Sequence, residues 1–211
     1  MIAEAANRRE LEQASDILLR AFRGNENARL GRGYARAMLR SFADTSARVL
    51  LVATEEGRVA GFAAGEPAGA VQERYHALRS AAARSLAIRP WLICTPDIFR
   101  MAVMRLRGEG HRDVPEESWF LALIAVDPAV AGRGIGRELL QAFEQEGARR
   151  GFSHASLQVA ATNTVAQALY SGCGWATDGT VRNRRICYVR TIQPGVIPHN
   201  FSVNFSRGIS L

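Results

Sequence analysis

The chain has 211 residues, of which 47% are hydrophobic and 22% are charged, and these values are typical of a globular protein with a substantial core. No stretch approaches the roughly 18 consecutive apolar residues of a membrane-spanning helix, and residues 1–10 lack the apolar region of a signal peptide. We therefore expect a cytoplasmic protein. Three cysteines without CxxC spacing and four scattered histidines predict neither disulfides nor a metal site.

The net charge is +7, and all 27 basic residues are arginine. The simpler explanation is genomic base composition, because alanine and glycine are also plentiful. The functional explanation is an anionic ligand that guanidinium groups would bind. The arginines are spread along the chain without an aromatic and basic cluster, so we expect no nucleic-acid partner.

The first part of the chain predicts two helices and three strands. Asn7 and Glu10 form a capping box at the start of the first helix, and Glu55-Glu56-Gly57 is typical of a hairpin turn. The predicted elements are a strand at 1–6, helices at 7–22 and 33–43, and strands at 48–54 and 58–65.

Residues 66–118 interrupt this pattern, and two helices are expected within them, at 71–86 and from Thr95 to about 107. One interpretation is a lid over the acceptor pocket. Core packing or an oligomer contact explains the pattern equally well, and contact with a membrane or an anionic partner is the least favoured reading. The arginines of this segment could favour an acidic acceptor, such as a nucleotide-linked amino sugar.

After residue 118 the pattern returns to alternating strands and helices. We expect strands at 119–126, 153–159 and 185–192 and helices from the glycine-rich turn to about 150 and at 163–172. Phe201, Val203 and Phe205 alternate with polar residues and predict one more strand. That strand could pair with its own sheet or with a partner's sheet, which would give a homodimer. The whole order indicates a single mixed α/β domain.

The turn between the strand at 119–126 and the following helix is the strongest indication of function. It carries Gly132, Gly134 and Gly136 at alternate positions. A strand that ends in a glycine-rich turn and opens a helix leaves several amides without partners, and these bind phosphate-type anions. Glycine allows φ > 0 and a close approach of the backbone to the ligand. The turn therefore predicts a phosphate site.

Two motifs resemble those of the GNAT acyltransferases. Gly134 and Gly136 fill the small positions of the family signature Gln/Arg-x-x-Gly-x-Gly/Ala, and Val126-Asp127-Pro128 matches its usual lead-in. A second family pattern, Asn-x-x-Ala-x-x-Leu-Tyr-x-x-x-Gly-Phe/Trp, matches Asn163, Ala166, Leu169, Tyr170, Gly174 and Trp175. The resemblance covers roughly residues 1–65 and 119–190.

This resemblance implies an α/β fold with one mixed sheet that opens between its fourth and fifth strands, with helices on both sides. The domain would span 1–190, with the helical insertion 66–118 between strands three and four, and 191–211 would form a C-terminal extension. The cofactor would be acetyl-CoA, and no metal is expected. Acetyl-CoA would lie in the opening, with its pyrophosphate on the 131–137 turn and its pantetheine along 124–126.

The resemblance also implies roles for single residues. The Val126 N–H would polarise the thioester carbonyl, and Tyr170 would protonate the departing thiolate as general acid. Either residue of the second motif has a structural alternative, since Asn163 can cap its helix and Tyr170 can be a core aromatic. The expected cofactor-binding residues are Ile124, Ala125, Val126, Ala131, Gly132, Arg133, Gly134, Ile135, Gly136, Arg137, Asn163 and Tyr170.

The chain departs from the family pattern at two places. Ala131 stands where the family usually has Gln or Arg, but backbone amides can bind phosphate without that side chain. Many relatives carry a Glu on the fourth strand as general base, whereas residues 120–123 contain no acid. The remaining candidates for the base are Glu117, Glu116, His111 or a chain of water molecules.

The expected function is acetyl-CoA-dependent transfer of an acetyl group to a primary amine of a small molecule, by direct attack within a ternary complex. The acceptor would be the partner molecule. Acetylation of protein N-termini is the alternative within enzymes. A non-catalytic acetyl-CoA sensor is the alternative from another class, because no base is evident.

Overall fold

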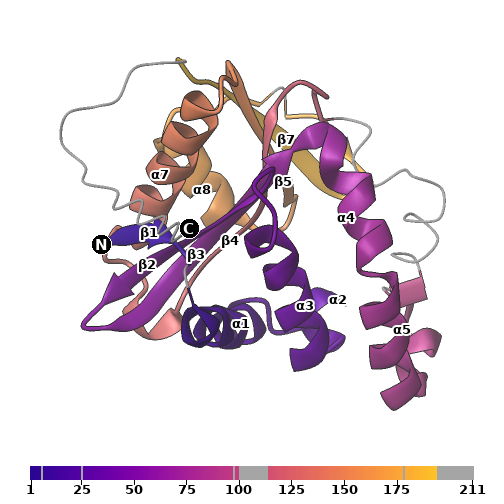
Figure 1. The fold of residues 1–211 in the computed structure, drawn as a ribbon. Helices are drawn as coiled ribbons and strands as arrows, with labels where there is room; N and C mark the ends of the chain where they lie inside the picture. The colour runs from indigo at the N-terminus through magenta and orange to yellow at the C-terminus, as the bar shows by residue number, and fades with distance from the viewer. Residues whose placement is uncertain (6, 25, 97, 100–113, 178, 194–211) are drawn as a thin grey trace.

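The protein is represented by a computed structural model, which describes residues 1–5, 7–24, 26–96, 98–99, 114–177 and 179–193 (Figure 1). Within these residues, seven strands form one sheet in the order β1-β2-β3-β4-β5-β7-β6. Neighbouring strands are antiparallel except for the parallel pair β4 and β5. The strands are β1 (Ile2–Glu4), β2 (Val49–Glu55), β3 (Arg58–Pro67), β4 (Trp119–Val126), β5 (His154–Ala160), β6 (Val181–Arg182) and β7 (Arg185–Thr191).

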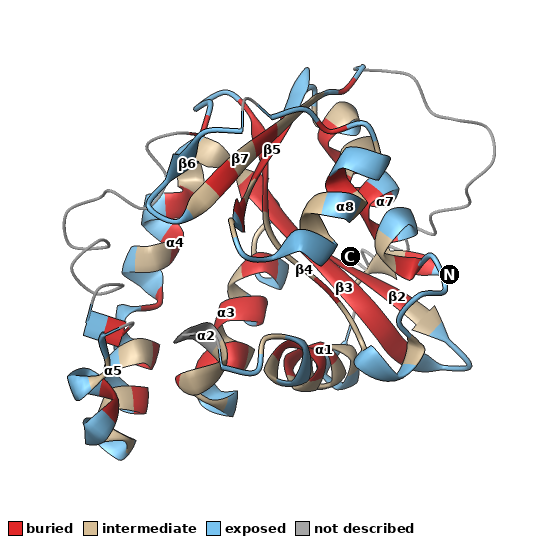
Figure 2. Cartoon of the chain, turned by 180° about the vertical axis from the view of Figure 1, so that it is seen from behind, coloured by how far each residue is buried: buried red, intermediate tan, exposed pale blue. Residues whose placement is uncertain are grey.

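Helices cover both faces of the sheet, as Figure 1 shows. On one face, α1 (Arg8–Ala21) and α3 (Arg32–Ala43), joined through α2 (Glu26–Arg29), pack a core around Leu50, Val52 and Phe62. On the other face, α7 (Ile135–Arg149) and α8 (Thr164–Gly172) pack around Leu51, Leu121 and Leu157. Short 3-10 turns complete the described elements: η1 (Ala68–Ala70), η2 (Pro90–Cys94) and η3 (Pro128–Val130). The central strands are buried from both sides (Figure 2).

The parallel strands β4 and β5 stay together over three residue pairs only. Trp119 lies opposite Ala155, Phe120 opposite Ser156 and Leu121 opposite Leu157, and no later residues of the two strands are paired. The paired end is held firmly, because the hydroxyls of Ser118 and Ser156 are hydrogen-bonded and Trp119 stacks on Phe143 at 5.7 Å between ring centroids. The sheet therefore opens between β4 and β5 from Ala122 onward, as expected.

Several predicted element bounds hold closely. Asn7 caps α1 by accepting a hydrogen bond from the Glu10 amide at 2.9 Å, as predicted, and β4 begins and ends at the predicted residues. β3 continues to Pro67, two residues beyond its predicted end, because it still pairs with Trp119 there. The two-residue strand β6 was not predicted, since it is too short to show alternation.

The insertion differs from its prediction. The expected helix 71–86 is two helices, α4 (Val71–Ala77) and α5 (Arg79–Ile88), which meet at Leu78. Leu78 is buried among the residues of the α1 and α3 core, and the chain bends around this contact. Residues 96, 98 and 99 are helical, while the rest of the predicted helix to 107 and the predicted strand at 201–206 lie outside the described residues.

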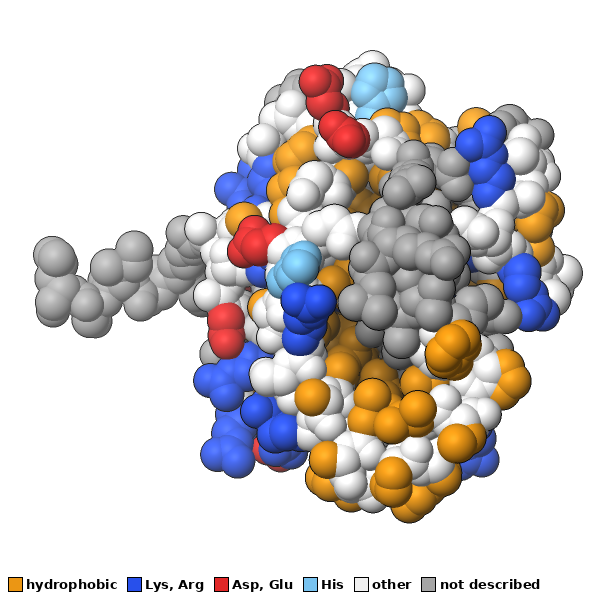
Figure 3. Space-filling view, turned by 90° about the vertical axis from the view of Figure 1, so that its right-hand side faces the viewer, with side chains coloured by type: hydrophobic (Ala, Val, Ile, Leu, Met, Phe, Trp, Pro, Cys, Tyr) orange, Lys and Arg blue, Asp and Glu red, His pale blue; other side chains and the backbone are white. Residues whose placement is uncertain are grey.

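The outer side of the insertion is rich in exposed apolar side chains. Ile88, Trp91, Ile93 and Phe99 are each more than half exposed, and hydrophobic side chains gather on the lower part of the face in Figure 3. Among the described elements, α5 contacts α3, α4 and η2. The insertion thus extends the helical layer of the α1 and α3 face.

Candidate active site

The glycine turn has the backbone geometry that its sequence predicts. Gly132 and Gly134 have φ angles of 84° and 86°, in the left-handed region that favours glycine. A Cβ at either position would meet no atom within 4 Å, so conformation rather than crowding requires glycine there. At Gly136 a Cβ would lie 3.4 Å from the Leu169 side chain, which is an ordinary van der Waals contact and shows that α7 and α8 lie side by side there.

The amides of this turn are available to a ligand. Gly134 is the N-cap of α7 and has no side-chain cap, and the first backbone bonds of the helix run from Arg137 and Glu138 to the Gly134 carbonyl. No hydrogen bond within the described residues uses the amides from Gly132 to Gly136. Such a row of free donors, at the positive end of a 15-residue helix, is suited to an anion.

Two arginines flank the turn. The Arg137 guanidinium donates to the Gly172 carbonyl at the end of α8 over 3.3 Å, and Arg133 forms an exposed ion pair with Glu55 at 3.6 Å. The lead-in is fixed by Asp127, which accepts from the Ala129 amide and pairs with Arg20 at 2.6 Å. The turn therefore joins β4, α1 and α8 into one unit.

Beyond Leu121, the edge of β4 that faces β5 is unpaired. The Asp127 amide donates to the Ala60 carbonyl at 2.8 Å on the β3 side. Since backbone groups alternate along a strand, Ile124 and Val126 present their N–H and C=O groups to the opening, and Ala125 presents its groups to β3. Of the three predicted strand residues, Ala125 therefore contributes no backbone group to the opening.

The second motif lies on α8, beside the same opening. Asn163 is the N-cap of α8, and its side-chain oxygen accepts a hydrogen bond from the Ala166 amide at 3.2 Å. Tyr170 is buried, with its ring 5.7 Å from that of Tyr188 and 6.2 Å from that of Trp175. Its hydroxyl forms no hydrogen bond within the described part of the chain. Burial raises the pKa of Tyr170 well above its usual value, so the phenol keeps its proton.

Two of the predicted bases, Glu116 and Glu117, lie away from the opening. Glu116 and Glu117 are exposed on a turn ahead of Trp119, at the paired end of β4. Glu117 precedes Val126 by nine residues, which corresponds to about 30 Å of extended strand. His111 lies outside the described residues. Glu117 therefore stays a prediction that this geometry does not favour.

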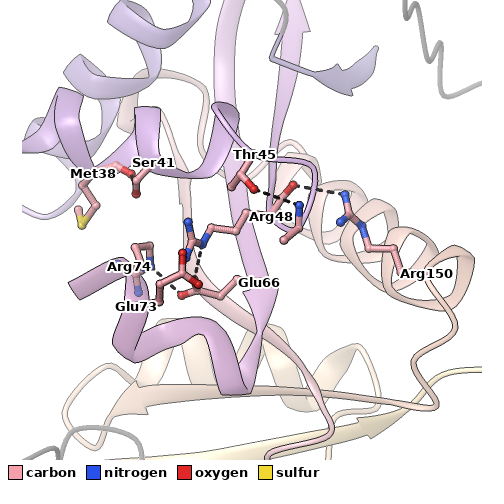
Figure 4. Close-up of polar contacts among 9 residues, drawn as sticks. Met38, Ser41, Thr45, Arg48, Glu66, Glu73, Arg74 and Arg150 are labelled. Atoms are coloured by element: carbon pink, nitrogen blue, oxygen red, sulfur yellow. Dashed lines mark hydrogen bonds and ion pairs between the residues drawn. The ribbon is translucent and has the colours of Figure 1, made fainter. Parts of the chain in front are cut away.

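A buried carboxylate that sequence reasoning missed lies at the end of β3. Glu66 is fully buried and accepts hydrogen bonds from Arg48 at 3.0 Å and from Arg74 at 2.7 Å (Figure 4). The Arg74 guanidinium also packs against the rings of Phe42 and Tyr75. Two arginines thus hold Glu66 as a paired carboxylate, which fixes α4 to β2 and β3 and leaves no free base there.

Gln158 on β5 is a second residue that the sequence did not single out. Its side-chain oxygen Oε1 is buried and has no hydrogen-bond partner. The alternation of polar Ser156 and Gln158 with apolar Leu157 and Val159 was visible in the sequence. The sequence did not show that the pairing of β4 with β5 ends at Leu157, directly before Gln158.

Within the part of the chain that the structure describes, no group of three or more His, Cys, Asp or Glu side chains is arranged to hold a metal ion. No helix among the same residues is long and apolar enough to cross a membrane.

The fold and the site together define an α/β protein whose sheet opens beside a glycine-rich turn with free amides. The sequence matches the model of the acetyltransferase (GNAT) family over residues 11–175. The chain therefore belongs to the GNAT family and is an acetyltransferase. Members of this family use acetyl-CoA, and the free turn amides and the open edge of β4 fit that cofactor.

Solved structures share the fold along nearly the whole chain. The crystal structure of SsHAT superposes with a TM-score of 0.65 at 20% sequence identity, and the match covers 90% of this chain and 97% of SsHAT. The ribosomal-protein-S18-alanine N-acetyltransferase from Escherichia coli has a TM-score of 0.54 at 19% sequence identity. That match covers 96% of this chain and 98% of the relative. An aminoglycoside 6'-acetyltransferase type Ii has a TM-score of 0.61 at 16% sequence identity, and the match covers 92% of this chain and 98% of that enzyme. At these identities the similarity shows the fold alone. No curated protein sequence matches this chain significantly.

Proposed function

We propose that this protein transfers the acetyl group of acetyl-CoA to a primary amine of a small molecule, by direct attack in a ternary complex. The observation that carries the proposal is the opening between β4 and β5, where the unpaired edge of β4 at Ile124 and Val126 leads into a turn with free amides. When bound, acetyl-CoA supplies an activated acetyl group as a thioester.

The chain holds this cofactor largely through its backbone. The amides from Gly132 to Gly136 bind the pyrophosphate, and Arg133 and Arg137 lie beside it as phosphate contacts. Ala131 contributes its backbone only, so the usual polar side chain is not needed. Ile124 and Val126 hydrogen-bond the pantetheine arm as an added strand would, and Asn163 contacts the same arm while it caps α8.

Two groups act on the reacting atoms. The Val126 N–H donates to the carbonyl oxygen of the acetyl group and stabilises the negative charge that develops there. The amine nitrogen forms the new N–C bond, the C–S bond breaks with its electron pair on sulfur, and Tyr170 gives its phenolic proton to that sulfur. The nitrogen loses one proton to water, and Tyr170 recovers one from water, so charge and atoms balance.

The insertion supports a small acceptor. Arg74 and Glu66 fix α4 over the sheet face next to the opening, and Val71 and Val114 pack on Phe120 there. This covering restricts the approach of a folded protein chain. The arginines on α4 and α5 suit an acceptor that also carries a negative charge. Acetylation of a protein N-terminus is the alternative, because one structural relative acts on a ribosomal protein.

Release of coenzyme A thiol from acetyl-CoA, measured over a library of amino sugars, polyamines and peptides, tests this proposal. We expect release with at least one small amine. Release with peptides alone would replace the small-molecule acceptor with a peptide. Tight binding of acetyl-CoA without release for any amine would contradict the enzyme and favour a sensor.

A further inference from the structure

Gln158 stands at the row where the sheet opens. It follows Leu157, the last β5 residue that pairs with β4, and it lies opposite Cys187 of β7. Leu157 and Val159 point into the core beneath α7. Side chains alternate along a strand, so Gln158 points to the opposite face, which the insertion covers around Phe120. Tyr170 approaches the opening from the α7 side, and Gln158 therefore faces it from the other side.

The buried oxygen of Gln158 is unusual among the polar atoms of this protein. Four buried side-chain nitrogen or oxygen atoms lack a hydrogen-bond partner in the described residues. Two belong to Asp16 and Arg36, which form ion pairs with Arg32 and Glu12, respectively. The third is the Trp119 nitrogen, whose ring is packed in the core.

The side-chain oxygen of Gln158 has no hydrogen-bond partner in the described residues. A buried amide oxygen without a donor costs free energy of desolvation, and in native proteins such an atom is commonly satisfied by a bound ligand or water. The ligand that fits this oxygen is an N–H donor.

We propose that Gln158 Oε1 accepts a hydrogen bond from the amine of the acceptor and directs its nitrogen toward the acetyl group. This inference rests on the proposed function, and it names the residue that receives the acceptor on the face opposite Tyr170. An amide oxygen binds an N–H group but cannot remove its proton at ordinary pH.

The pairing of Glu66 with Arg48 and Arg74 leaves no free carboxylate buried on this face among the described residues. The amine must therefore arrive neutral. The rate of transfer should rise with pH along the titration of the free amine, without the contribution of an enzyme base.

The test compares Gln158→Met and Gln158→Glu with the wild type and with Gln141→Glu, a matched control on the exposed side of α7. Steady-state transfer is measured from pH 6 to 10 with the best amine of the library. Binding of the same amine to the protein saturated with coenzyme A is measured by calorimetry. Affinity for acetyl-CoA is measured for every variant.

We expect Gln158→Met to weaken amine binding and raise the KM for the amine about tenfold, as for the loss of one hydrogen bond, with unchanged acetyl-CoA affinity. Gln158→Glu should move the acidic limb of the pH profile to lower pH, because its carboxylate can take the proton. Gln141→Glu should change neither the affinity for the amine nor the pH profile. Unchanged amine affinity in Gln158→Met, or an equal loss of acetyl-CoA affinity, would overturn the inference.

The calorimetric measurement separates this inference from the proposed function. If the wild type binds the amine beside coenzyme A but transfers no acetyl group, the proposed function fails, whereas the effect of Gln158→Met on amine affinity still decides the inference.

Discussion

Leu121 of β4 lies opposite Leu157 of β5, and this is the last pair that the two strands form. Both side chains are buried in the core beneath α7, so the paired end cannot separate further without exposing that core. From the next residue onward, β4 leaves its edge open toward β5. The site depends on this point, because an edge that β5 covered could not bind an extended ligand through backbone groups.

Replacement of Gly134 by alanine should weaken acetyl-CoA binding. The φ angle of 86° is strained for an L-residue by about 1–2 kcal/mol, and relief of this strain would turn the free amides away from the ligand. We expect the Kd for acetyl-CoA to rise about tenfold or more. Isothermal titration calorimetry checks this expectation.

Gly24→Ala is the matched control, because Gly24 has a φ of 90° and equally open surroundings but follows α1. It should show a similar loss of stability and an unchanged Kd. Equal effects of both variants on binding would show that the turn has no special role.

Replacement of Glu66 by alanine should destabilise the protein strongly. The change leaves Arg48 and Arg74 as buried charges without their shared carboxylate, and loss of one partner from a buried ion pair costs about 3–5 kcal/mol. Urea unfolding followed by tryptophan fluorescence measures the free energy of unfolding. Glu73→Ala is the control, since Glu73 is exposed and pairs with Arg48 at 3.6 Å, and it should cost less than about 1 kcal/mol. Similar losses in both variants would argue against the buried network.

Glu146 should make stability depend on pH. Burial alone would raise the pKa of Glu146, but hydrogen bonds from Arg149 and Arg150 and their charges outweigh burial and hold the pKa below its usual value. A carboxyl whose pKa is lowered by folding stabilises the folded state above its unfolded pKa, near 4.3. That contribution is lost as the pH falls through the lower folded value.

Urea unfolding between pH 6 and pH 3 tests this dependence. The free energy of unfolding of Glu146→Gln should fall less steeply across this range than that of the wild type. Glu138→Gln, at an exposed position of the same helix, should follow the wild type. A parallel decline in all three proteins would remove Glu146 as the cause.

The sequence predicted those features that depend on neighbours along the chain. The apolar run of β4, the glycines of the turn and the Asn163 cap depend on local periodicity and on backbone conformation, and all three are present. The break of the insertion helix at Leu78 was missed because it follows from a contact with the α1 and α3 core.

Glu66 and Gln158 were missed for a similar reason. The partners of Glu66 are 18 and 8 residues away, and only the pairing of β2 with β3 and the position of α4 bring them together. The isolation of Gln158 depends on the point at which β4 separates from β5. Neither relationship is local, so no spacing in the sequence could reveal it.

The central claim is that Tyr170 supplies the proton for acetyl transfer within this opening. The most direct measurement is coenzyme A release by Tyr170→Phe beside the acetyl-CoA affinity of the same variant. The phenyl ring keeps the packing against Tyr188 and Trp175 but has no proton to give, so we expect transfer to slow about 100-fold or more with unchanged affinity. Transfer at the wild-type rate by Tyr170→Phe would contradict the account.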